Sequence, residues 1–129
     1  MSGNYYIQAT VKTPEIKIDT EARVMEMRGR SLPEDAIEFY NSAIIALDEA
    51  LSANDSFTLK FYLEYLNTSS SSIIRSIMEL AADAMGRPGR DYIVQWYFEE
   101  DDLEMEEMGK HYEQTIPGLE IEYHEVDSI

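Results

Sequence analysis

The sequence predicts an α/β fold over residues 1–129: a single domain with a small mixed sheet and helices packed mainly on one face. Segments of helical periodicity alternate with segments of strand alternation, in the order β-β-α-β-α-β-α-β. Right-handed crossovers between neighbouring strands place such helices on one side of the sheet. In residues 57–66 one strand face is apolar and the other is mixed, which indicates a sheet covered on one side only.

The composition is that of an ordinary globular domain with enough apolar material for a core. The chain has 129 residues, of which 44% are hydrophobic and 11% are aromatic, and this length corresponds to about one domain. There is no cysteine. Thiol nucleophiles, thiolate zinc sites and redox pairs are therefore excluded, and a reducing compartment is favoured.

The charge balance narrows the class of partner. Twenty-six acidic residues against ten Lys and Arg give a net charge of −16, which repels nucleic-acid phosphates and anionic membranes. The apolar run of residues 43–47 is far too short to span a bilayer. Residues 1–4 do not resemble the start of a secretory signal. We expect a cytoplasmic protein that binds proteins or small molecules, with no nucleic-acid binding and no membrane insertion.

The first third of the chain predicts a hairpin followed by a helix. Ile16 and Ile18 alternate with polar neighbours, residues 19–22 suit a turn, and residues 24–28 alternate again. Ser31-Leu32-Pro33-Glu34 predicts a capping box at the start of a helix that ends near Asn54. The helix carries one apolar stripe, which consists of Ile37, Tyr40, Ile44, Leu47 and Leu51.

The rest of the chain predicts three strands and two helices. In the strand of residues 57–66, the apolar face that should lie on the helices consists of Phe57, Leu59, Phe61, Leu63 and Tyr65. A second helix follows directly and ends at Gly86 and Gly89. A strand over residues 92–98 leads to a third helix, opened by the acidic residues 99–102, with Leu103, Met105, Met108 and Tyr112 as its apolar positions. Residues 119–123 predict the last strand.

A run of hydroxyl residues lies between the central strand and the second helix: Asn67-Thr68-Ser69-Ser70-Ser71-Ser72. One interpretation is a helix cap, since Asn, Ser and Thr are preferred there, although one such residue suffices. The other is a modified or anion-binding loop. A phosphate would add about −1.5 to −2 charges, and the helix amides and dipole would hold it in place. It would alter a docking surface at little cost to the fold.

Three groups of residues are more informative together than alone. They are Tyr65-Leu66-Asn67-Thr68-Ser69-Ser70, Ser31-Leu32-Pro33-Glu34 with Phe39-Tyr40, and Trp96-Tyr97 with Glu100-Asp101-Asp102, Met105 and Gly109. In this order they resemble the motifs of the SiaC family of bacterial regulatory phosphoproteins, and the resemblance covers most of the chain. In that family a lysine commonly follows the serines, whereas the first basic residue here is Arg75.

The resemblance implies a STAS-like domain, similar to anti-sigma factor antagonists, and a role in signal transduction without enzyme activity. It implies that Thr68 is the phosphoacceptor, with Ser69 and Ser70 as runners-up, and that these residues and Asn67 form the partner-binding loop. The implied partners are a diguanylate cyclase, a cognate serine/threonine kinase and a PP2C-type phosphatase. The unmodified form would bind and activate the cyclase, raising cyclic di-GMP and favouring biofilm growth, and the phosphorylated form would not.

No catalytic or metal site is predicted. The sequence has no nucleophile elbow and no glycine-rich phosphate-binding loop, so we expect no enzyme and no cofactor. Glu107 and His111 are four residues apart, as metal ligands can be, but a third ligand is not evident and a surface role is expected. We expect His124 to be solvated.

Three other segments have ordinary structural interpretations beside a functional one. The acidic residues 99–102 suit a helix N-terminus, or an acidic docking face for a basic partner. The turn of residues 86–90 is separated from Thr68 by a helix about 24 Å long, so we do not expect it to clamp a phosphate there. Tyr62 and Tyr97 lie on the less apolar sheet face, either singly exposed or as a docking patch.

Two functions therefore stand side by side. The first is a phosphorylation-controlled activator of a diguanylate cyclase. The second is a partner-switching protein of the anti-sigma antagonist kind, which sequesters a kinase-like regulator. A small-molecule sensing domain is a more distant third, since it requires a pocket.

Overall fold

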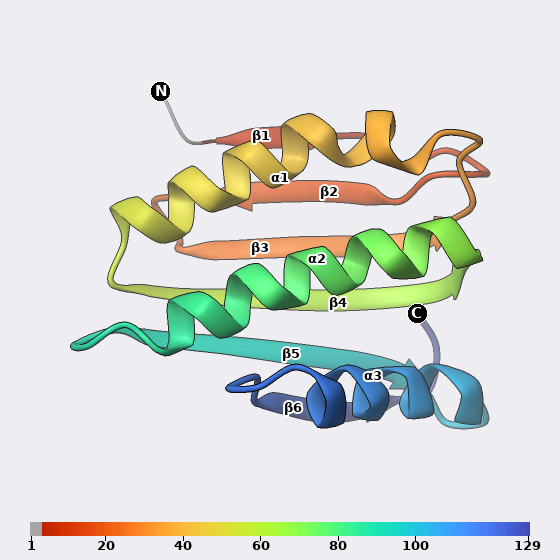
Figure 1. The fold of residues 1–129 in the computed structure, drawn as a ribbon. Helices are drawn as coiled ribbons and strands as arrows, with labels where there is room; N and C mark the ends of the chain where they lie inside the picture. Colours follow the sequence, from red (N-terminus) through yellow and green to blue (C-terminus); the bar gives the residue numbers. More distant parts are fainter. Residues whose placement is uncertain (1–3) are drawn as a thin grey trace.

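Three helices cover one face of a six-stranded sheet in the computed structural model, which describes residues 4–129 (Figure 1). In chain order the elements are β1 (Tyr5–Ile7), β2 (Glu15–Asp19), β3 (Val24–Ser31), α1 (Ala36–Ala53), β4 (Ser56–Leu66), α2 (Thr68–Met85), β5 (Asp91–Glu99), α3 (Leu103–Thr115) and β6 (Ile121–Val126). Among the described residues, no helix is both long and apolar enough to cross a membrane.

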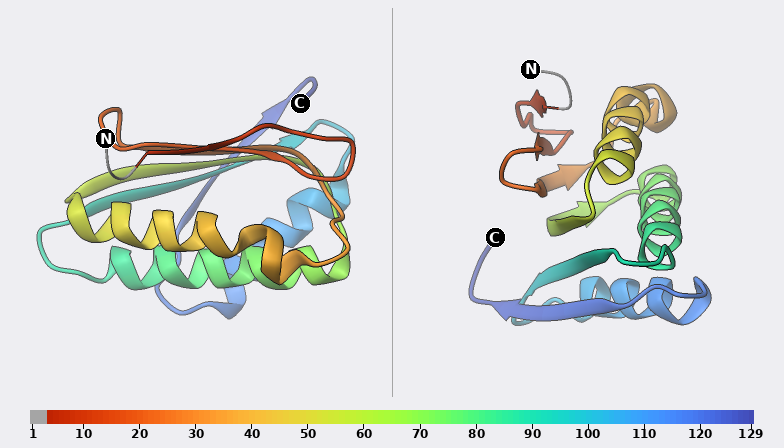
Figure 2. Two further views of the ribbon diagram at one scale, coloured as in Figure 1. Left: turned by 90° about the horizontal axis from the view of Figure 1, so that it is seen from above. Right: turned by 90° about the vertical axis from the view of Figure 1, so that its left-hand side faces the viewer.

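The strands lie in the sheet in the same order as in the sequence, β1-β2-β3-β4-β5-β6. β2 is antiparallel to both of its neighbours, β1 and β3, and β3 to β6 run parallel. Each parallel connection contains a helix, and all three helices lie on the same face while the other face is open (Figure 2). The predicted mixed sheet, covered on one side, is therefore confirmed.

Parallel strands bring their carboxyl ends to one edge of the sheet. The ends of β3, β4 and β5 and the first turns of α1, α2 and α3 therefore lie together, and we call this end of the molecule the carboxyl edge (Figure 1). The loop between β1 and β2 joins the same edge, because the Leu32 amide donates to the Lys12 carbonyl at 2.8 Å. The segment of residues 67–72 begins here.

Large apolar side chains between the sheet and the helices form the core. The strand alternation of β4 is confirmed up to Leu63, and every second residue of β5 from Tyr92 is buried in the same way. The largest fully buried side chains include Trp96, Tyr40, Phe57 and Phe61. The burial of these and the other core side chains removes apolar area from water and is the main stabilising contribution to this fold.

Two predictions at the N-terminal end were incomplete or wrong. The predicted hairpin is present as β2 and β3, but a further strand, β1, pairs with β2 at the sheet edge. The predicted capping box is wrong: Asp35 caps α1, and its Oδ1 accepts from the Glu38 amide at 3.1 Å. Ser31 still belongs to β3, where it pairs with Leu66 of β4, and its hydroxyl bonds to the side chains of Tyr40 and Ser70 and not to the first amides of α1.

Three apolar residues that were expected in the core are exposed instead: Ile37 by 73%, Tyr65 by 46% and Leu103 by 69%. In α1 the buried stripe contains alanines, Ala36 among them, so Ile37 is displaced from it by one helical position. Leu103 lies two positions before the buried Met105 and so faces away from the core. α1 therefore packs on the sheet partly through alanines, and α3 begins to pack on it at Met105 and not at Leu103.

Tyr65 is turned outward by an irregularity in the β3–β4 pairing. The register shifts between Gly29 and Arg30, so that Gly29 pairs with Leu63 while Arg30 pairs with Tyr65. Gly29 has φ +122°, a conformation that residues with a Cβ rarely adopt. After the shift Leu66 is buried in place of Tyr65.

Candidate functional site

The hydroxyl-rich segment begins at the carboxyl edge, where Asn67 connects β4 to α2. The Asn67 amide donates to the Ser31 carbonyl at 2.9 Å, which fixes the connection to the end of β3. The Asn67 Oδ1 accepts from the Ser70 amide at 2.9 Å and from the Ser69 hydroxyl at 3.3 Å. Asn67 is thus the N-cap, and the capping interpretation is confirmed for this one residue.

Ser70 belongs to a buried chain of hydroxyls beneath the segment. Its Oγ lies 2.7 Å from the Ser31 Oγ, which in turn lies 2.6 Å from the Tyr40 hydroxyl. Both serines are completely buried, and burial raises the pKa of Tyr40 to about 12. This chain joins β3, α1 and α2 and leaves the Ser70 hydroxyl out of contact with solvent. The sequence motif contained Ser31 and Tyr40, but their pairing was missed because it depends on the fold.

The hydroxyls of the next two serines, Ser71 and Ser72, also make hydrogen bonds. The Ser71 and Ser72 hydroxyls donate to the Thr68 carbonyl at 2.8 and 3.5 Å, and the Ser71 carbonyl accepts from the Tyr112 hydroxyl of α3 at 2.8 Å. Burial raises the pKa of Tyr112 well above its usual range, so this hydroxyl remains a donor. The segment is therefore attached to α3 as well as to α1.

Thr68 differs from its neighbours. It is the first residue of α2, its side chain is exposed, and its hydroxyl has no hydrogen-bond partner within residues 4–129. The Asn67 carbonyl and side chain already satisfy the amides of Ser70 and Ser71. The two amides before them, those of Thr68 and Ser69, stay available to an anion at this helix terminus.

Acidic residues flank this position on both sides. The start of α1 carries Glu34, Asp35 and Glu38, and the start of α3 carries residues 99–102. Asp102 caps α3 by accepting from the Met105 amide at 3.0 Å, which confirms the structural interpretation of the acidic run for this residue. A phosphate on Thr68 would add its charge to a surface that is already negative.

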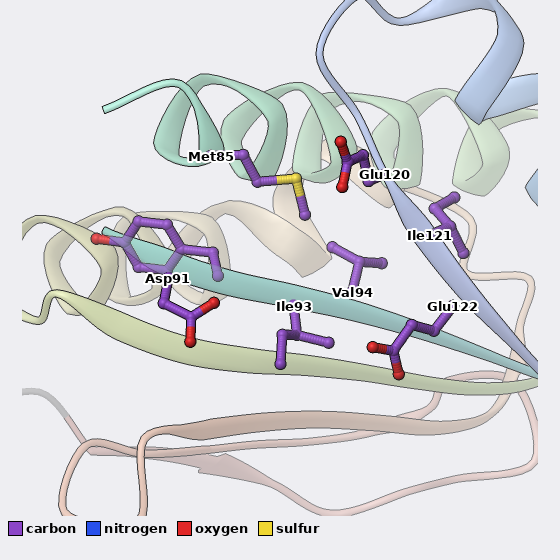
Figure 3. Close-up of a pocket in the computed structure, with 8 residues that line it drawn as sticks. Met85, Asp91, Ile93, Val94, Glu120, Ile121 and Glu122 are labelled. Atoms are coloured by element: carbon purple, nitrogen blue, oxygen red, sulfur yellow. The ribbon is translucent and has the colours of Figure 1, made fainter. Parts of the chain in front are cut away.

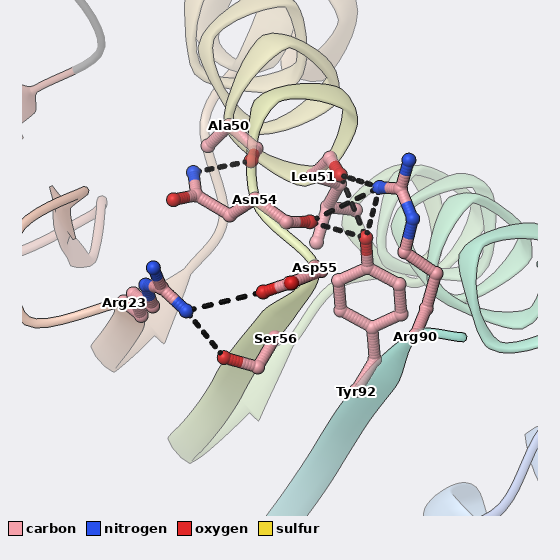
Figure 4. Close-up of polar contacts among 8 residues, drawn as sticks. All are labelled: Arg23, Ala50, Leu51, Asn54, Asp55, Ser56, Arg90 and Tyr92. Carbon is pink, nitrogen blue, oxygen red and sulfur yellow. Dashed lines mark hydrogen bonds and ion pairs between the residues drawn. The ribbon is translucent and has the colours of Figure 1, made fainter.

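The turn of residues 86–90 lies at the other end of α2 and has structural contacts of its own (Figure 4). Arg87 pairs with Asp83 at 3.0 Å. Arg90 donates to the carbonyls of Leu51 and Asn54 at 3.4 and 3.2 Å, and thereby holds the end of α1 against β5. The interpretation of this segment as a turn and not as a phosphate clamp is confirmed.

Tyr62 and Tyr97 are not singly exposed on the open face of the sheet. Their rings stack at 4.1 Å, the Arg28 guanidinium covers Tyr62 at 3.9 Å, and His124 stacks on Tyr97 at 4.8 Å. The His124 side chain is 40% exposed, so the expectation that it is solvated holds in part, but its ring also packs on Tyr97 of the neighbouring strand. The three rings stack on one another's faces in a row across β4, β5 and β6, and the Arg28 guanidinium of β3 covers the end of the row.

A shallow hollow of about 370 Å³ lies at the opposite end of the sheet from Thr68 (Figure 3). β5 starts at Asp91, but its pairing with β6 starts only at Val94, which lies opposite Ile121. The start of β5 therefore has a gap at its side, next to Met85. Asp91, Glu120 and Glu122 also line it. None of the predicted site residues contributes to this hollow. Among residues 4–129, no group of three His, Asp or Glu side chains could hold a metal ion, and Glu107 and His111 gain no third ligand.

Comparison with known proteins identifies the family. Residues 7–126 match the family model described as SiaC family regulatory phosphoprotein. An uncharacterized protein of Pseudomonas aeruginosa (strain UCBPP-PA14) is 27% identical over 111 residues, which cover 85% of this chain and 87% of that protein.

Solved structures show the same fold over almost the whole chain. SiaC of Pseudomonas aeruginosa has a TM-score of 0.82 at 26% identity, covering 96% of this chain and 97% of that chain. The crystal structure of apo-SiaC from that organism has a TM-score of 0.85 at 26% identity, covering 96% and 99%. A crystal structure of the diguanylate cyclase SiaD in complex with its activator SiaC, from the same organism, has a TM-score of 0.86 at 24% identity, covering 95% and 99%, and shows the shared fold. The chain belongs to the SiaC family of regulatory phosphoproteins.

Proposed function

We propose that this protein is a non-enzymatic switch of cyclic di-GMP signalling. In its unmodified form it binds and activates a diguanylate cyclase in the cytoplasm, and phosphorylation of Thr68 ends that activation. A cognate serine/threonine kinase adds the phosphate and a PP2C-type phosphatase removes it. Family membership and the solved complex of a similar activator with its cyclase support the choice of partner.

The observation that carries the proposal is the position of the Thr68 hydroxyl. Ser69 donates to the helix cap, Ser70 is buried, and Ser71 donates to a backbone carbonyl. Thr68 is exposed and has no such contact within residues 4–129, so its modification breaks no hydrogen bond. A kinase would find this hydroxyl without unfolding the helix.

The charge of the phosphate explains how binding changes while the fold does not. A phosphothreonine carries about −1.5 to −2 charges, and the amides and dipole at the start of α2 stabilise it there. A partner that covers this position has to strip water from the phosphate, and the neighbouring carboxylates of α1 and α3 offer that charge no neutralising group. The desolvation of such an unpaired charge costs several kcal/mol at an interface, which corresponds to a loss of affinity on the order of 100-fold or more.

The test compares four forms of the protein: wild type, Thr68→Ala, Thr68→Glu and the matched control Ser72→Ala, an exposed hydroxyl on the next turn of α2. Each is used as bait in the native lysate, and a recovered cyclase is purified for calorimetry and for its conversion of GTP to cyclic di-GMP. We expect wild type, Thr68→Ala and Ser72→Ala to bind and activate it, and Thr68→Glu to do neither. The phosphate should be found by mass spectrometry in wild type and Ser72→Ala and be absent from Thr68→Ala.

Two results would overturn the proposal. Equal affinity of the cyclase for wild type and Thr68→Glu would remove the charge switch from Thr68. Recovery of a sigma-factor regulator in place of a cyclase would instead favour the partner-switching antagonist, which uses the same loop on a different partner.

A further inference from the structure

β6 forms an open edge of the six-stranded sheet. It is the last strand in the sheet order, and among residues 4–129 no further strand pairs with its outer side (Figure 1). The opposite edge strand, β1, has only three residues, whereas β6 has six. Proteins commonly shorten or cover edge strands, because their unpaired backbone groups bind other strands. β6 is the longer of the two edges at which this sheet can be extended.

The hydrogen bonds at the two ends of β6 show which of its backbone groups face outward. The Val126 carbonyl accepts from the Glu100 amide, just after β5, at 3.0 Å, so the even-numbered residues of β6 turn their backbone groups toward β5. The Ile121 amide points the other way and donates to the Glu113 carboxylate of α3 at 2.9 Å. The odd-numbered residues of β6 therefore face outward, since successive residues of a strand point to opposite sides.

The outer edge of β6 thus offers a regular set of unused backbone groups. No hydrogen bond within residues 4–129 uses the amides of Tyr123 and Glu125. The segment that follows β6 does not cover them, because the Ile129 amide donates to the Glu99 carboxylate of β5. A strand laid along this edge would meet donors and acceptors at the spacing of a sheet ladder.

The row of stacked rings on the open face of the sheet also ends at β6. The Arg28 guanidinium covers Tyr62 at one end of the row, and His124 stacks on Tyr97 at the other end. The His124 side chain is partly exposed, and no further ring or guanidinium of residues 4–129 covers its outer face. An arginine on an added strand, beside His124, would continue the row in the way that Arg28 begins it.

The charge along the edge selects the kind of strand. Glu122 and Glu125 are exposed on opposite faces of β6. A second copy of β6 would bring the same carboxylates to the contact, in chains that each carry a net charge of −16, so charge opposes self-pairing. A strand with Lys or Arg opposite Glu122 is attracted instead. Its alternate side chains would lie beside Ile121 and Tyr123, which pack against the core and suit an apolar neighbour.

From these observations we infer that β6 is a docking edge for an extended basic segment of a partner protein. The segment adds a strand to the sheet by hydrogen bonding to the outward backbone groups of Tyr123 and Glu125. Its basic side chains lie beside Glu122 and His124. In strand addition of this kind the backbone bonds supply affinity and the alternate side chains supply specificity. The docking edge does not depend on Thr68, which belongs to α2.

The test uses three peptides as long as β6. One alternates Arg and Val, the second alternates Arg and Pro and so carries the same charge without the Val amides, and the third alternates Glu and Val. Binding to the isotope-labelled full chain is followed by NMR chemical shifts and amide hydrogen exchange. We expect the Arg–Val peptide to shift residues 121–126 and to slow exchange of the Tyr123 and Glu125 amides. The other two peptides should bind at least about tenfold more weakly.

Two pairs of variants separate the backbone from the charge. Glu125→Pro and its matched control Glu125→Gln lose the same carboxylate, but only the proline removes the outward amide, and an edge strand tolerates proline at such a position. Glu122→Lys reverses the charge at the edge, and its matched control is Glu49→Lys on the exposed side of α1. In each pair we expect the first variant to bind the Arg–Val peptide about tenfold more weakly than its control. The emission of Trp96 checks that every variant is folded.

Four results would overturn the inference. Equal binding of the Arg–Val and Arg–Pro peptides would mean that charge alone attracts them. Equal affinities within either pair of variants would remove the backbone contact or the charge contact from β6. Thr68→Glu should bind the Arg–Val peptide as wild type does, and a loss there would place the peptide at the start of α2. A dimer in analytical ultracentrifugation that Glu125→Pro dissociates would assign the edge to a second copy of this chain.

Discussion

The close contact between Gly109 of α3 and the ring of Trp96 predicts that Gly109→Ala destabilises the protein. A Cβ at position 109 would lie 2.8 Å from both Cδ1 and Nε1 of Trp96, well inside van der Waals contact. The ring cannot move away easily. It is completely buried, its Nε1 donates to the Met105 carbonyl at 2.8 Å, and Phe61 and Tyr112 pack against it.

The expected magnitude is the difference between two opposing effects. Alanine is more favourable than glycine inside a helix by about 1 kcal/mol. Forcing a methyl group into a packed core costs about 1–3 kcal/mol, and the fixed position of Trp96 places this case at the upper end. The free energy of unfolding should therefore fall by about 1–2 kcal/mol.

Urea denaturation followed by tryptophan fluorescence measures this directly, because Trp96 is the only tryptophan of the chain. The control is Glu107→Ala on the exposed side of the same helix, for which a change within about 0.5 kcal/mol is expected. Gly109→Ala should also shift the native emission of Trp96. An unchanged or increased stability with unchanged emission would mean that α3 does not pack on Trp96, and would remove the basis for placing Leu103 at the carboxyl edge.

Three further predictions concern the segment itself and the groups beneath it. Asn67→Ala removes the α2 cap and should lower the free energy of unfolding by about 0.5–2 kcal/mol in urea denaturation; no change would mean that the cap is not formed. Ser70→Ala removes a buried hydrogen bond to Ser31 and should cost about 1–3 kcal/mol, while mass spectrometry still finds phosphate at Thr68. Burial raises the pKa of Tyr40 to about 12 from an ordinary value of about 10, so the folded state favours the neutral phenol. The stabilisation that this pKa difference provides is complete below pH 10 and is lost as the pH rises toward 12. The free energy of unfolding in urea should therefore fall over that interval, and it should fall less steeply in Tyr40→Phe. Equal slopes in the two proteins would mean that the pKa of Tyr40 is not raised by folding.

Much of the sheet and the helices could be predicted from the sequence because burial imposes a period on the chain. The alternation in β4 gave its core face correctly up to Leu63, and that in β5 did so throughout. The hydroxyl run marked the region where α2 begins, but the prediction that all of it lies before the helix was wrong, because Asn67 is the cap and α2 starts at Thr68. These features depend on neighbours within a few residues. The order of elements then restricts the topology, since successive right-handed crossovers place all the helices on one face.

The wrong predictions concern residues whose position depends on a segment that is far away in the sequence. Ser31 resembles a helix cap in sequence, but it pairs with Leu66 and bonds to Ser70, which is 39 residues away. Tyr65 continues the alternation of β4 until the glycine in β3 shifts the register. The hydroxyl segment is a further example. The sequence indicates a site there, but it does not show which hydroxyl is free. Only the structure shows that Ser69 bonds to the helix cap, Ser70 to Ser31 of β3 and Ser71 to a backbone carbonyl, while the described residues offer the Thr68 hydroxyl no partner.

The central claim is tested most directly by the rate at which the purified cognate cyclase makes cyclic di-GMP from GTP. The rate is measured alone, with this protein unmodified, and with this protein phosphorylated stoichiometrically at Thr68 by its kinase. The account predicts activation by the unmodified form, none by the phosphorylated form, and recovery of activation after treatment with the phosphatase. Equal activation by both forms would contradict it.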